Sequence, residues 1–502
     1  MTVILDEFAR PLPSSKEKKR SEYKASLKTS YERNLRAKYD SAQTTNENEK
    51  HWAQADGLSA NAAINHEVRK KTRDRARYEM ANDPYASGMQ QTKKISVIGS
   101  GPRPSFLLDD NVEAGLELQR RFMQWARAVR LPAKLRSIYG AYCGSDGEGF
   151  AVRIHNPNVS DDVPSLDYRV YETEQFASPY FDLQSANYID GVRLDPITGE
   201  AVSYTLLGQH PGDQFIWSSG ALDHEVITAD RVLHLFRRDR PGQIRGVSHM
   251  APALPLYAKR RRFTMATITA AETAASIAAV LYADHAALTD EDIASLDDDA
   301  FFDLPRGSMP VMPLGYKLGQ LKSEHPSTTY DMFNRAILSE IARCFGMPYN
   351  IAAANSADMN YASGRMDDQN WRRLVDVERR WFEQEILDRI LSDWLDEAFL
   401  IPNYLPRSLG SFAGGEIPHR WYWDPAPHVD PEKEATGFAL LWDRGIGLDE
   451  DYIYETLGKD PAEFYASAAR QNKRRKEANM PIPGADAQTQ PSQAMRNEPN
   501  KD

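Results

Sequence analysis

The chain has 502 residues, a length that exceeds one hydrophobic core and predicts two or more packed regions. A formal net charge of -11 and a pI near 5.6 argue against a protein that coats nucleic acid over its whole surface. Its two cysteines, Cys143 and Cys344, lie far apart in the sequence, so neither a disulfide framework nor a thiolate zinc site is predicted.

Residues 1–50 are predicted to form a basic arm. Between Lys16 and Lys38, nine Lys or Arg stand against three Glu. This pattern fits either a solvated helix face or a basic contact surface. The first twenty residues carry acids and prolines where a signal peptide needs a basic start and an apolar middle, so export is not expected.

Helical periodicity runs from about residue 51 to Asp83, and the pattern changes after Pro84. The stretch "KKISVIGSGPRPSF", residues 93–106, is predicted to be a strand followed by a turn. Helix is expected again from Leu116 to Cys143, where a glycine-rich turn ends it.

The next segment has the alternation typical of strands. Strands are predicted in "GFAVRIHNP" at 149–157, "LDYRVYE" at 166–172 and "EVITADRVLHLFRR" at 225–238. A hairpin is predicted at 190–208, with "DPITGE" as its turn. With the helices on either side, these strands make the chain an α+β protein.

Helices dominate after Gly246. An Ala-rich helix is predicted over 250–284, a second over 330–345, and a very long one over 363–399, about 55 Å at 1.5 Å per residue. A segment with short strand signals and repeated Pro and Gly separates the first two. The small, polar stretch "NSADMNYASGRM", residues 355–366, lies between the second and the third.

The C-terminal part combines one aromatic strand with short helices. The strand is "HRWYWDPAP" at 419–427, and helices follow from about 430 to 475. From Met480 onward the chain is polar and rich in Pro, Gln and Asn, which predicts a disordered tail.

The sequence contains none of the motifs GxxxxGK[ST], HExxH and GxSxG, so no enzyme activity, metal site or cofactor is predicted. The acids Asp297, Asp298 and Asp299 lack the glycine and terminal glutamate of a calcium loop, and we expect them to form a surface that meets a partner. The alternative is a metal-dependent DNA-processing enzyme that uses these acids.

A membrane pore is the other alternative, because residues 263–282 are 20 residues long and follow the basic "KRRR". The carboxylate of Glu272 and the many Ala and Thr favour instead a soluble helix packed closely against its neighbours. No membrane association is therefore expected.

Three motifs carry a family resemblance. They are "HEVRKKTRDRARYEMANDPYASGM" at 66–89 with "GSGPRPSF" at 99–106, "HLFRRDRPGQIRGVSHMAPAL" at 234–254, and "ARCFGMPYNIAAANSADMNYASGRMDDQNWRR" at 342–373. Together with the order of the elements, they resemble the lambda-like bacteriophage portal proteins. Family members would read Asn-Tyr-Ser-Ser-x-Arg at 360–365, where this chain has Ala362 in place of the first Ser.

The resemblance implies an α+β portal architecture: an α/β wing, long stem helices, a small α/β clip, a kinked long helix and a helical crown. The implied boundaries are the basic arm at 1–50, wing at 51–249 and 400–430, stem helices at 250–284 and 329–346, clip at 285–328, tunnel loop at 347–362, long helix at 363–399, crown at 431–478 and disordered tail at 479–502.

The resemblance also implies a function. About twelve copies would form a ring at one vertex of the capsid, through which double-stranded DNA is packaged and ejected. Implied partners are other copies of the chain, the major capsid protein, the large terminase subunit, head-tail adaptor or completion proteins, and DNA. The implied location is the portal vertex of the virion, with the host cytoplasm during assembly.

The candidate site residues follow from these assignments. The implied tunnel loop would place these residues in the DNA channel: Asn355, Ser356, Asp358, Met359, Asn360, Tyr361 and Ser363. Six basic residues of the stem helices could contact phosphates or instead pair with acids of neighbouring subunits: Lys259, Arg260, Arg261, Arg262, Arg335 and Arg343.

Overall fold

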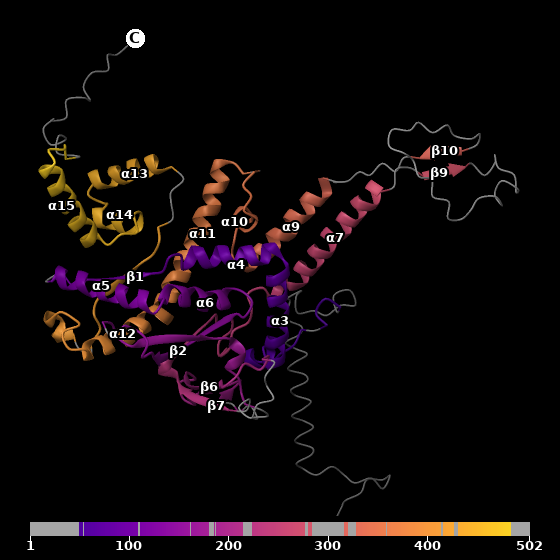
Figure 1. The fold of residues 1–502 in the computed structure, drawn as a ribbon. Helices are drawn as coiled ribbons and strands as arrows, with labels where there is room; N and C mark the ends of the chain where they lie inside the picture. The colour runs from indigo at the N-terminus through magenta and orange to yellow at the C-terminus, as the bar shows by residue number, and fades with distance from the viewer. Residues whose placement is uncertain are drawn as a thin grey trace, which may run out of the picture. The chain divides into compact units, whose positions relative to one another are not determined.

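Figure 1 shows the computed structural model, which describes residues 50–53, 55–108, 111–160, 162–179, 185, 187–213, 223–276, 280–283, 316–319, 328–357, 359–412, 415–425 and 430–482. The chain divides into two compact units, Met1–Ser59 and Ala60–Asp502. The predicted basic arm, apart from Lys50, lies outside the described residues, as do residues 483–502 of the predicted tail. The helices and strands below belong to the second unit.

Three helices begin this unit: α2 (Ala60–Ala63), α3 (His66–Asn82) and α4 (Pro84–Val97). Asp83 connects α3 and α4. Its backbone N–H donates to the carbonyl of Glu79 at 2.7 Å, and its carboxylate accepts from the backbone N–H of Tyr85 at 2.9 Å. One residue therefore ends α3 and caps the first turn of α4.

The strand predicted from residue 93 is wrong, because residues 93–97 form the last turn of α4. Val97 is buried and Ile95 is exposed, so these β-branched residues lie on opposite sides of a helix that Asp83 and Pro84 have already started. The strand begins only at Arg103, in β1 (Arg103–Phe106).

The helix predicted from Leu116 to Cys143 begins earlier and is divided into two, α5 (Val112–Ala128) and α6 (Leu131–Cys143), with Arg130 at φ 54° between them. Phe122 and Trp125 of α5 pack against Trp394, with ring centroids 5.2 Å and 6.4 Å away. This aromatic group belongs to the larger of two hydrophobic cores and ties α5 to a helix more than 250 residues later in the chain.

All strand pairs are antiparallel in the described part of the chain, as expected for an α+β protein. One sheet has the order β3-β2-β8, and a second has the order β4-β5-β6-β7. Their bounds are β2 (Glu148–His155), β3 (Leu166–Tyr171), β4 (Tyr188–Ile189), β5 (Val192–Leu194), β6 (Ala201–Leu207), β7 (His224–Thr228) and β8 (Val232–Phe236). The predicted hairpin is β5–β6, in which Val192 pairs with Tyr204.

Two further pairs join distant segments. Strand β1 pairs with β11 (His419–Tyr422), so the chain comes back to β1 after the long helix. Strand β9 (Val280–Ala283) pairs with β10 (Tyr316–Gly319).

The helix predicted over 250–284 is shorter in the structure. A short 3-10 turn precedes α7 (Leu254–Ser276), and residues 280–283 form strand β9. The Ala-rich composition misled the prediction at this end, because Val280, Leu281 and Tyr282 pair with β10. In the described part of the chain, no helix combines the length and apolar character needed to cross a membrane.

Helix α9 (Thr328–Cys344) lies beside α7 (Figure 1), and the short α10 (Tyr349–Ala353) follows. The predicted long helix is present as α11 (Tyr361–Phe382), a π-helical turn (Glu383–Leu387) and α12 (Asp388–Leu400). Its predicted apolar face is buried at Trp371, Val375, Phe382, Ile386, Ile390 and Trp394. The π turn interrupts the α-helical hydrogen bonds, a feature that sequence periodicity does not register.

Helices α13 (Pro431–Asp443), α14 (Asp449–Glu455) and α15 (Pro461–Glu477) complete the described chain. The hydroxyl of Tyr454 in α14 donates to the carbonyl of Trp421 at 2.9 Å, and Arg103 donates to the carbonyl of Gly458 at 3.2 Å. These bonds attach the terminal helices to the β1–β11 pair.

Candidate functional site

The basic residues at the start of α7 are not equivalent. Arg260 is buried, forms an ion pair with Asp83, and lies 4.7 Å from the centroid of the Tyr85 ring. Arg261 donates two hydrogen bonds to the Glu79 carboxylate, at 2.7 Å and 3.1 Å. Both therefore attach α7 to the α3–α4 junction within one chain, whereas the pairing we expected was with acids of another subunit.

Lys259 and Arg262, on either side of this anchored pair, are exposed. In the part of the chain that the structure describes, neither forms an ion pair. Of the four basic residues predicted here, these two present their charge to solvent, and Arg260 does not.

Aromatic contacts hold α7 against α9. The Phe263 ring stacks on Tyr330 with centroids 5.7 Å apart and contacts Phe333 at 4.3 Å. Beyond these rings the two helices expose apolar side chains: Met265, Ile268 and Met332. The pair thus has an internal aromatic contact and three apolar side chains that the described residues leave exposed.

The two candidate cations of α9 lie near its middle and in its last turn. The Arg335 guanidinium lies 4.9 Å from the Tyr349 ring of α10, and Arg343 is exposed in the last turn. Gly346 follows the end of α9 with φ +70°, and a Cβ there would come within 2.2 Å of Leu374. A glycine at this position lets the chain turn sharply toward α10.

The predicted tunnel loop at 347–362 is only partly a loop. Residues 349–353 form α10, and α11 already begins at Tyr361. Residues 354–360 connect α10 to α11; Ala354 has φ 50°, and the backbone N–H of Met359 donates to the carbonyl of Ser356 at 3.2 Å. The family resemblance implied one continuous loop, and the sequence did not indicate α10 because single turns of helix carry little periodicity.

Asn360 caps the helix that follows. Its side-chain oxygen accepts from the backbone N–H of Ser363 at 2.8 Å, and the Ser363 hydroxyl donates to the Asn360 carbonyl at 3.1 Å. Asn355 and Ser356 are exposed, as is Tyr361, whose ring lies 5.8 Å from the Lys433 ammonium. Asp358 lies outside the described residues. Asn360 and Ser363 thus fix the start of α11, whereas Asn355, Ser356 and Tyr361 face solvent.

The acids Asp297, Asp298 and Asp299 lie outside the described residues. Within the described ranges, three potential metal ligands come together in Glu172, Glu174 and His210, with ligand atoms within 4.8 Å of one another. Glu174 already forms ion pairs with Arg73 at 2.7 Å and Arg77 at 2.9 Å. Two guanidinium groups next to this carboxylate oppose the binding of another cation.

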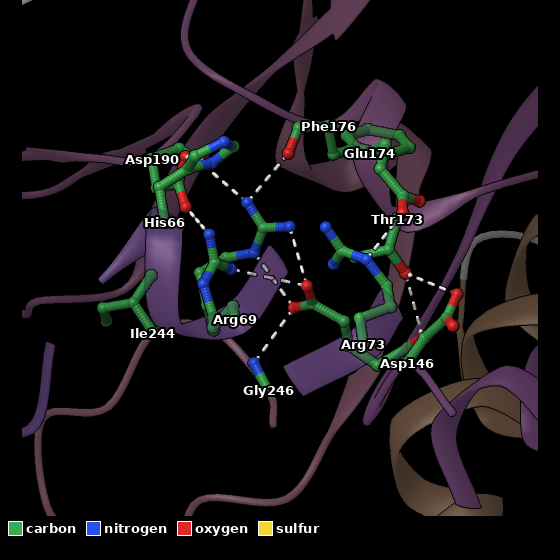
Figure 2. Close-up of polar contacts among 12 residues, drawn as sticks. His66, Arg69, Arg73, Asp146, Thr173, Glu174, Phe176, Asp190, Ile244 and Gly246 are labelled. Atoms are coloured by element: carbon green, nitrogen blue, oxygen red, sulfur yellow. Dashed lines mark hydrogen bonds and ion pairs between the residues drawn. The ribbon is translucent and has the colours of Figure 1, made fainter. Parts of the chain in front are cut away.

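A buried ionic cluster that the sequence did not predict lies beside the first sheet. Glu148 of β2 accepts two hydrogen bonds from Arg245, at 2.8 Å and 2.9 Å, and one from the backbone N–H of Gly246 at 3.0 Å. Arg69 of α3 reaches the same carboxylate and pairs with Asp190 (Figure 2). The cluster thus joins α3, β2, the β4–β5 turn and the segment before α7.

Two glycines allow this close approach. Gly147 has φ +77°, and a Cβ on it would lie 2.0 Å from the backbone of Val247. A Cβ on Gly246 would lie 2.3 Å from the carbonyl oxygen of Gly147. The Gly246 of the second motif is therefore needed for backbone packing next to Glu148.

The protonation states in the cluster are set by opposing effects. Burial would raise the pKa of Glu148, but Arg245, His234 and Arg69 outweigh it and hold that pKa well below its usual range. Burial lowers the pKa of His234 to about 4 despite its hydrogen bond to Glu148. At neutral pH the cluster therefore holds a charged Glu148 and a neutral His234.

Tyr204, His234 and Glu148 form a hydrogen-bonded chain that resembles a nucleophile, a base and an acid. The Tyr204 oxygen lies 3.2 Å from Nδ1 of His234, whose Nε2 lies 3.2 Å from Glu148. Tyr204 and His234 line a cavity of about 820 Å³ between β6, β8 and α11. However, burial raises the pKa of Tyr204 to about 12 and lowers that of His234, shifts opposite to those of an activated nucleophile and its base.

Comparison with known proteins decides the family. Residues 45–379 match the family described as phage portal protein, lambda family. The chain belongs to the lambda family of phage portal proteins. The matched range includes every candidate stem and tunnel-loop residue of this portal-family chain, and it ends before α12 and α13–α15.

One curated relative of this portal-family chain is a probable portal protein of Halomonas phage phiHAP-1. The two are 25% identical over 294 residues, which is 55% of each protein, so the chain covers about half of that relative. Among solved structures it is similar to a chain in the virion of a native gene transfer agent particle, with 14% identity and a TM-score of 0.42 over 79% of this chain and 93% of the other. It is also similar to a chain in the neck of an empty gene transfer agent particle, with 14% identity and a TM-score of 0.44 over 76% of this chain and 92% of the other.

Proposed function

We propose that this chain is the subunit of a ring, of about twelve copies, that forms the portal vertex of a phage-like capsid and conducts double-stranded DNA in packaging and ejection. The observation that carries this proposal is the match of residues 45–379 to the lambda portal family. A structural conduit needs no catalytic group, and the pKa shifts of Tyr204 and His234 do not favour catalysis at the hydrogen-bonded chain described above.

The parts of the subunit are assigned in the order implied by the family. The two sheets with α3–α6 and β11 make up the wing, α7 and α9 the stem, and the segment around β9 and β10 the clip. Helices α13–α15 make up the crown. Support for the stem comes from Met265, Ile268 and Met332, because exposed apolar side chains on a helix pair fit burial against the next subunit.

Fewer basic residues are proposed to contact DNA than the sequence suggested. Lys259, Arg262 and Arg343 are exposed and suit phosphate contacts, whereas Arg260 and Arg261 anchor α7. Asn355, Ser356 and Met359 line the proposed channel in the connection before α11. A channel with few cations suits a conduit, because DNA must move through it. Each phosphate neutralised by Lys or Arg strengthens DNA binding through counterion release.

The partners follow from the same proposal. The ring would sit at one vertex of the capsid built by the major capsid protein, and its clip, with Asp297–Asp299, would meet the terminase large subunit and later the head-tail adaptors. Because the sequence has no ATP-binding loop, the motor would be a separate protein. Assembly would take place in the host cytoplasm.

Electron microscopy of the purified full-length chain tests the function directly. We expect rings with a central opening, because the exposed apolar surface of α7 and α9 needs a partner that faces it around a closed symmetry. Compact monomers or dimers at all protein and salt concentrations would contradict the proposal. Metal-dependent cleavage of DNA that is lost in Asp297→Ala and Asp299→Ala would support the nuclease alternative instead.

The connection before α11 gives a second prediction. Replacing residues 356–359 with Gly-Ser-Gly-Ser, while keeping the cap Asn360, should leave rings intact and reduce the DNA retained in filled heads. The reason is that residues of this connection are proposed to contact the duplex, and Ser356 and Ala357 are exposed within the subunit. Ring counts by microscopy and encapsidated DNA by nuclease protection measure the two effects.

The matched control is Asn360→Ala, which removes the cap of α11 and should cost about 1 kcal/mol of stability. If the Gly-Ser replacement abolished rings, the connection would be a structural joint. If it changed neither rings nor retained DNA, the proposed channel contact would be wrong.

A further inference from the structure

Helix α15 carries a concentration of positive charge that the family match does not cover, since that match ends at residue 379. Five cations occur between Arg470 and Lys476, and no acid lies among them. Arg475 donates to the carbonyl of Pro481 at 3.0 Å and so has a structural role. The other four are exposed, and we call them the α15 cations: Arg470, Lys473, Arg474 and Lys476.

The α15 cations are not neutralised within the described chain, where none of them forms an ion pair. The acid on α15 before the cations is Glu463, in the first turn of the helix. From Glu463 to Arg470, the first of the α15 cations, the helix rises about 10 Å. This exceeds the Debye length of about 8 Å at physiological salt, so Glu463 screens the cations only weakly. Glu477, at the end of the helix, offsets one charge.

Helix stability accounts for only part of the cluster. Favourable interaction of cations with the helix dipole is limited to the last turn, which holds Arg474 and Lys476, whereas Arg470 lies seven residues before the end of α15. Arg470, Lys473 and Arg474 have the i, i+3 and i+4 spacing of one helix face. Like charges at this spacing destabilise a helix by about 0.2–0.5 kcal/mol per pair. An external anion would remove that repulsion.

The composition of α15 distinguishes between anionic partners. A helix that binds an anionic membrane carries bulky apolar residues opposite its cations. Residues 466–476 read "ASAARQNKRRK", in which Ala is the only apolar residue type. Phe464 and Tyr465 lie earlier in α15, so the part of the helix that carries the cations has the charge for a polyanion but no bulky apolar side chain for a lipid surface.

We propose that the α15 cations bind the phosphate backbone of double-stranded DNA, outside the channel contacts of α7 and α9. The choice of DNA rests on the proposed portal function, since α15 would lie in the crown. Flexible Lys and Arg side chains on one helix face contact phosphates without reading base edges, so binding is independent of sequence and strongly salt-dependent.

The test compares the full-length chain with a variant in which all four α15 cations are changed to Gln. Fluorescence anisotropy with a 30-base-pair duplex at several salt concentrations gives the slope of log K against log [salt]. Each phosphate contact contributes about 0.9 to this slope. We expect the magnitude of the slope to fall by about 2–4 and the affinity to drop at least tenfold at low salt.

Two controls isolate the position of the charge. The exposed residues Lys70, Lys71, Arg75 and Arg380, changed to Gln, alter the net charge equally and should leave most of the binding intact. Exchanging Lys for Arg and Arg for Lys at the α15 cations should also preserve binding. An equal loss in the first control, or an unchanged slope in the four-Gln variant, would overturn the proposal. Tighter binding to vesicles of anionic lipid than to DNA would overturn it as well.

Imaging the same samples separates this inference from the proposed function. If the protein forms rings and the four-Gln variant has an unchanged slope of log K against log [salt], only the role of α15 in DNA binding is contradicted. If the four-Gln variant has a reduced slope but neither protein forms rings, DNA binding by α15 is supported and the proposed ring function is contradicted.

Discussion

Glu148→Gln is expected to lower the free energy of opening of the β3-β2-β8 sheet by about 3–5 kcal/mol. This is the range for removing one partner of a buried ion pair. Glu148 is fully buried, and its carboxylate pairs with Arg245 and Arg69. The neutral amide would leave two buried guanidinium groups without their counter-charge. It would also direct an NH₂ group toward donors that now bind a carboxylate.

Hydrogen exchange of the β2 amides is the suitable measurement, because a chain of this size does not unfold in one step and a global midpoint would mix several regions. The matched control is Glu225→Gln on the exposed strand β7, with an expected change within about 0.5 kcal/mol. Equal exchange in the two variants would show that the ionic cluster contributes little to the stability of the sheet.

The elements that could be predicted are those whose local pattern agrees with their tertiary environment. The apolar face of the long helix, from Trp371 to Trp394, is buried where 3.6-residue periodicity places it. The β5–β6 hairpin follows from alternation on both sides of a turn. In both cases the residues that determine the element lie within it.

Predictions failed where the deciding interaction is distant or lies in a neighbouring turn. Residues 95–97 look like a strand, but the capping of α4 by Asp83 places them in a helix. Conversely, residues 280–283 continue a helical composition but pair with β10, more than thirty positions later. A window along the sequence registers neither effect.

The sequence located the connection before α11 but predicted neither helix α10 nor the ionic cluster at Glu148. The motif from Ala342 to Arg373 located the connection before α11, yet α10 was missed because one helical turn has no period to detect. Glu148 gave only one signal, a carboxylate directly before the apolar start of a strand, and the sequence does not show that Arg69 and Arg245 reach it. Its cluster involves segments almost a hundred residues apart, so only the fold brings it together.

The four basic residues at 259–262 show most clearly what the structure adds, and they provide the second prediction with a large effect. Arg260→Ala should lower stability by about 3–5 kcal/mol, because it leaves the buried carboxylate of Asp83 without its cation. Asp83 also caps α4, so the uncompensated charge would weaken the α3–α4 junction itself. Hydrogen exchange of the α4 amides and the yield of intact rings measure the effect.

Arg262→Ala, two positions along the same helix, is the matched control, since Arg262 is exposed and its removal should change stability by less than about 0.5 kcal/mol. If Arg262 contacts DNA as proposed, this variant should assemble normally and package less DNA, whereas Arg260→Ala should fail before packaging begins. Equal stability of the two variants would contradict the anchoring role of Arg260. Normal packaging by Arg262→Ala together with Lys259→Ala would remove the start of α7 from the DNA contacts and leave Arg343 as the exposed cation of the stem to test.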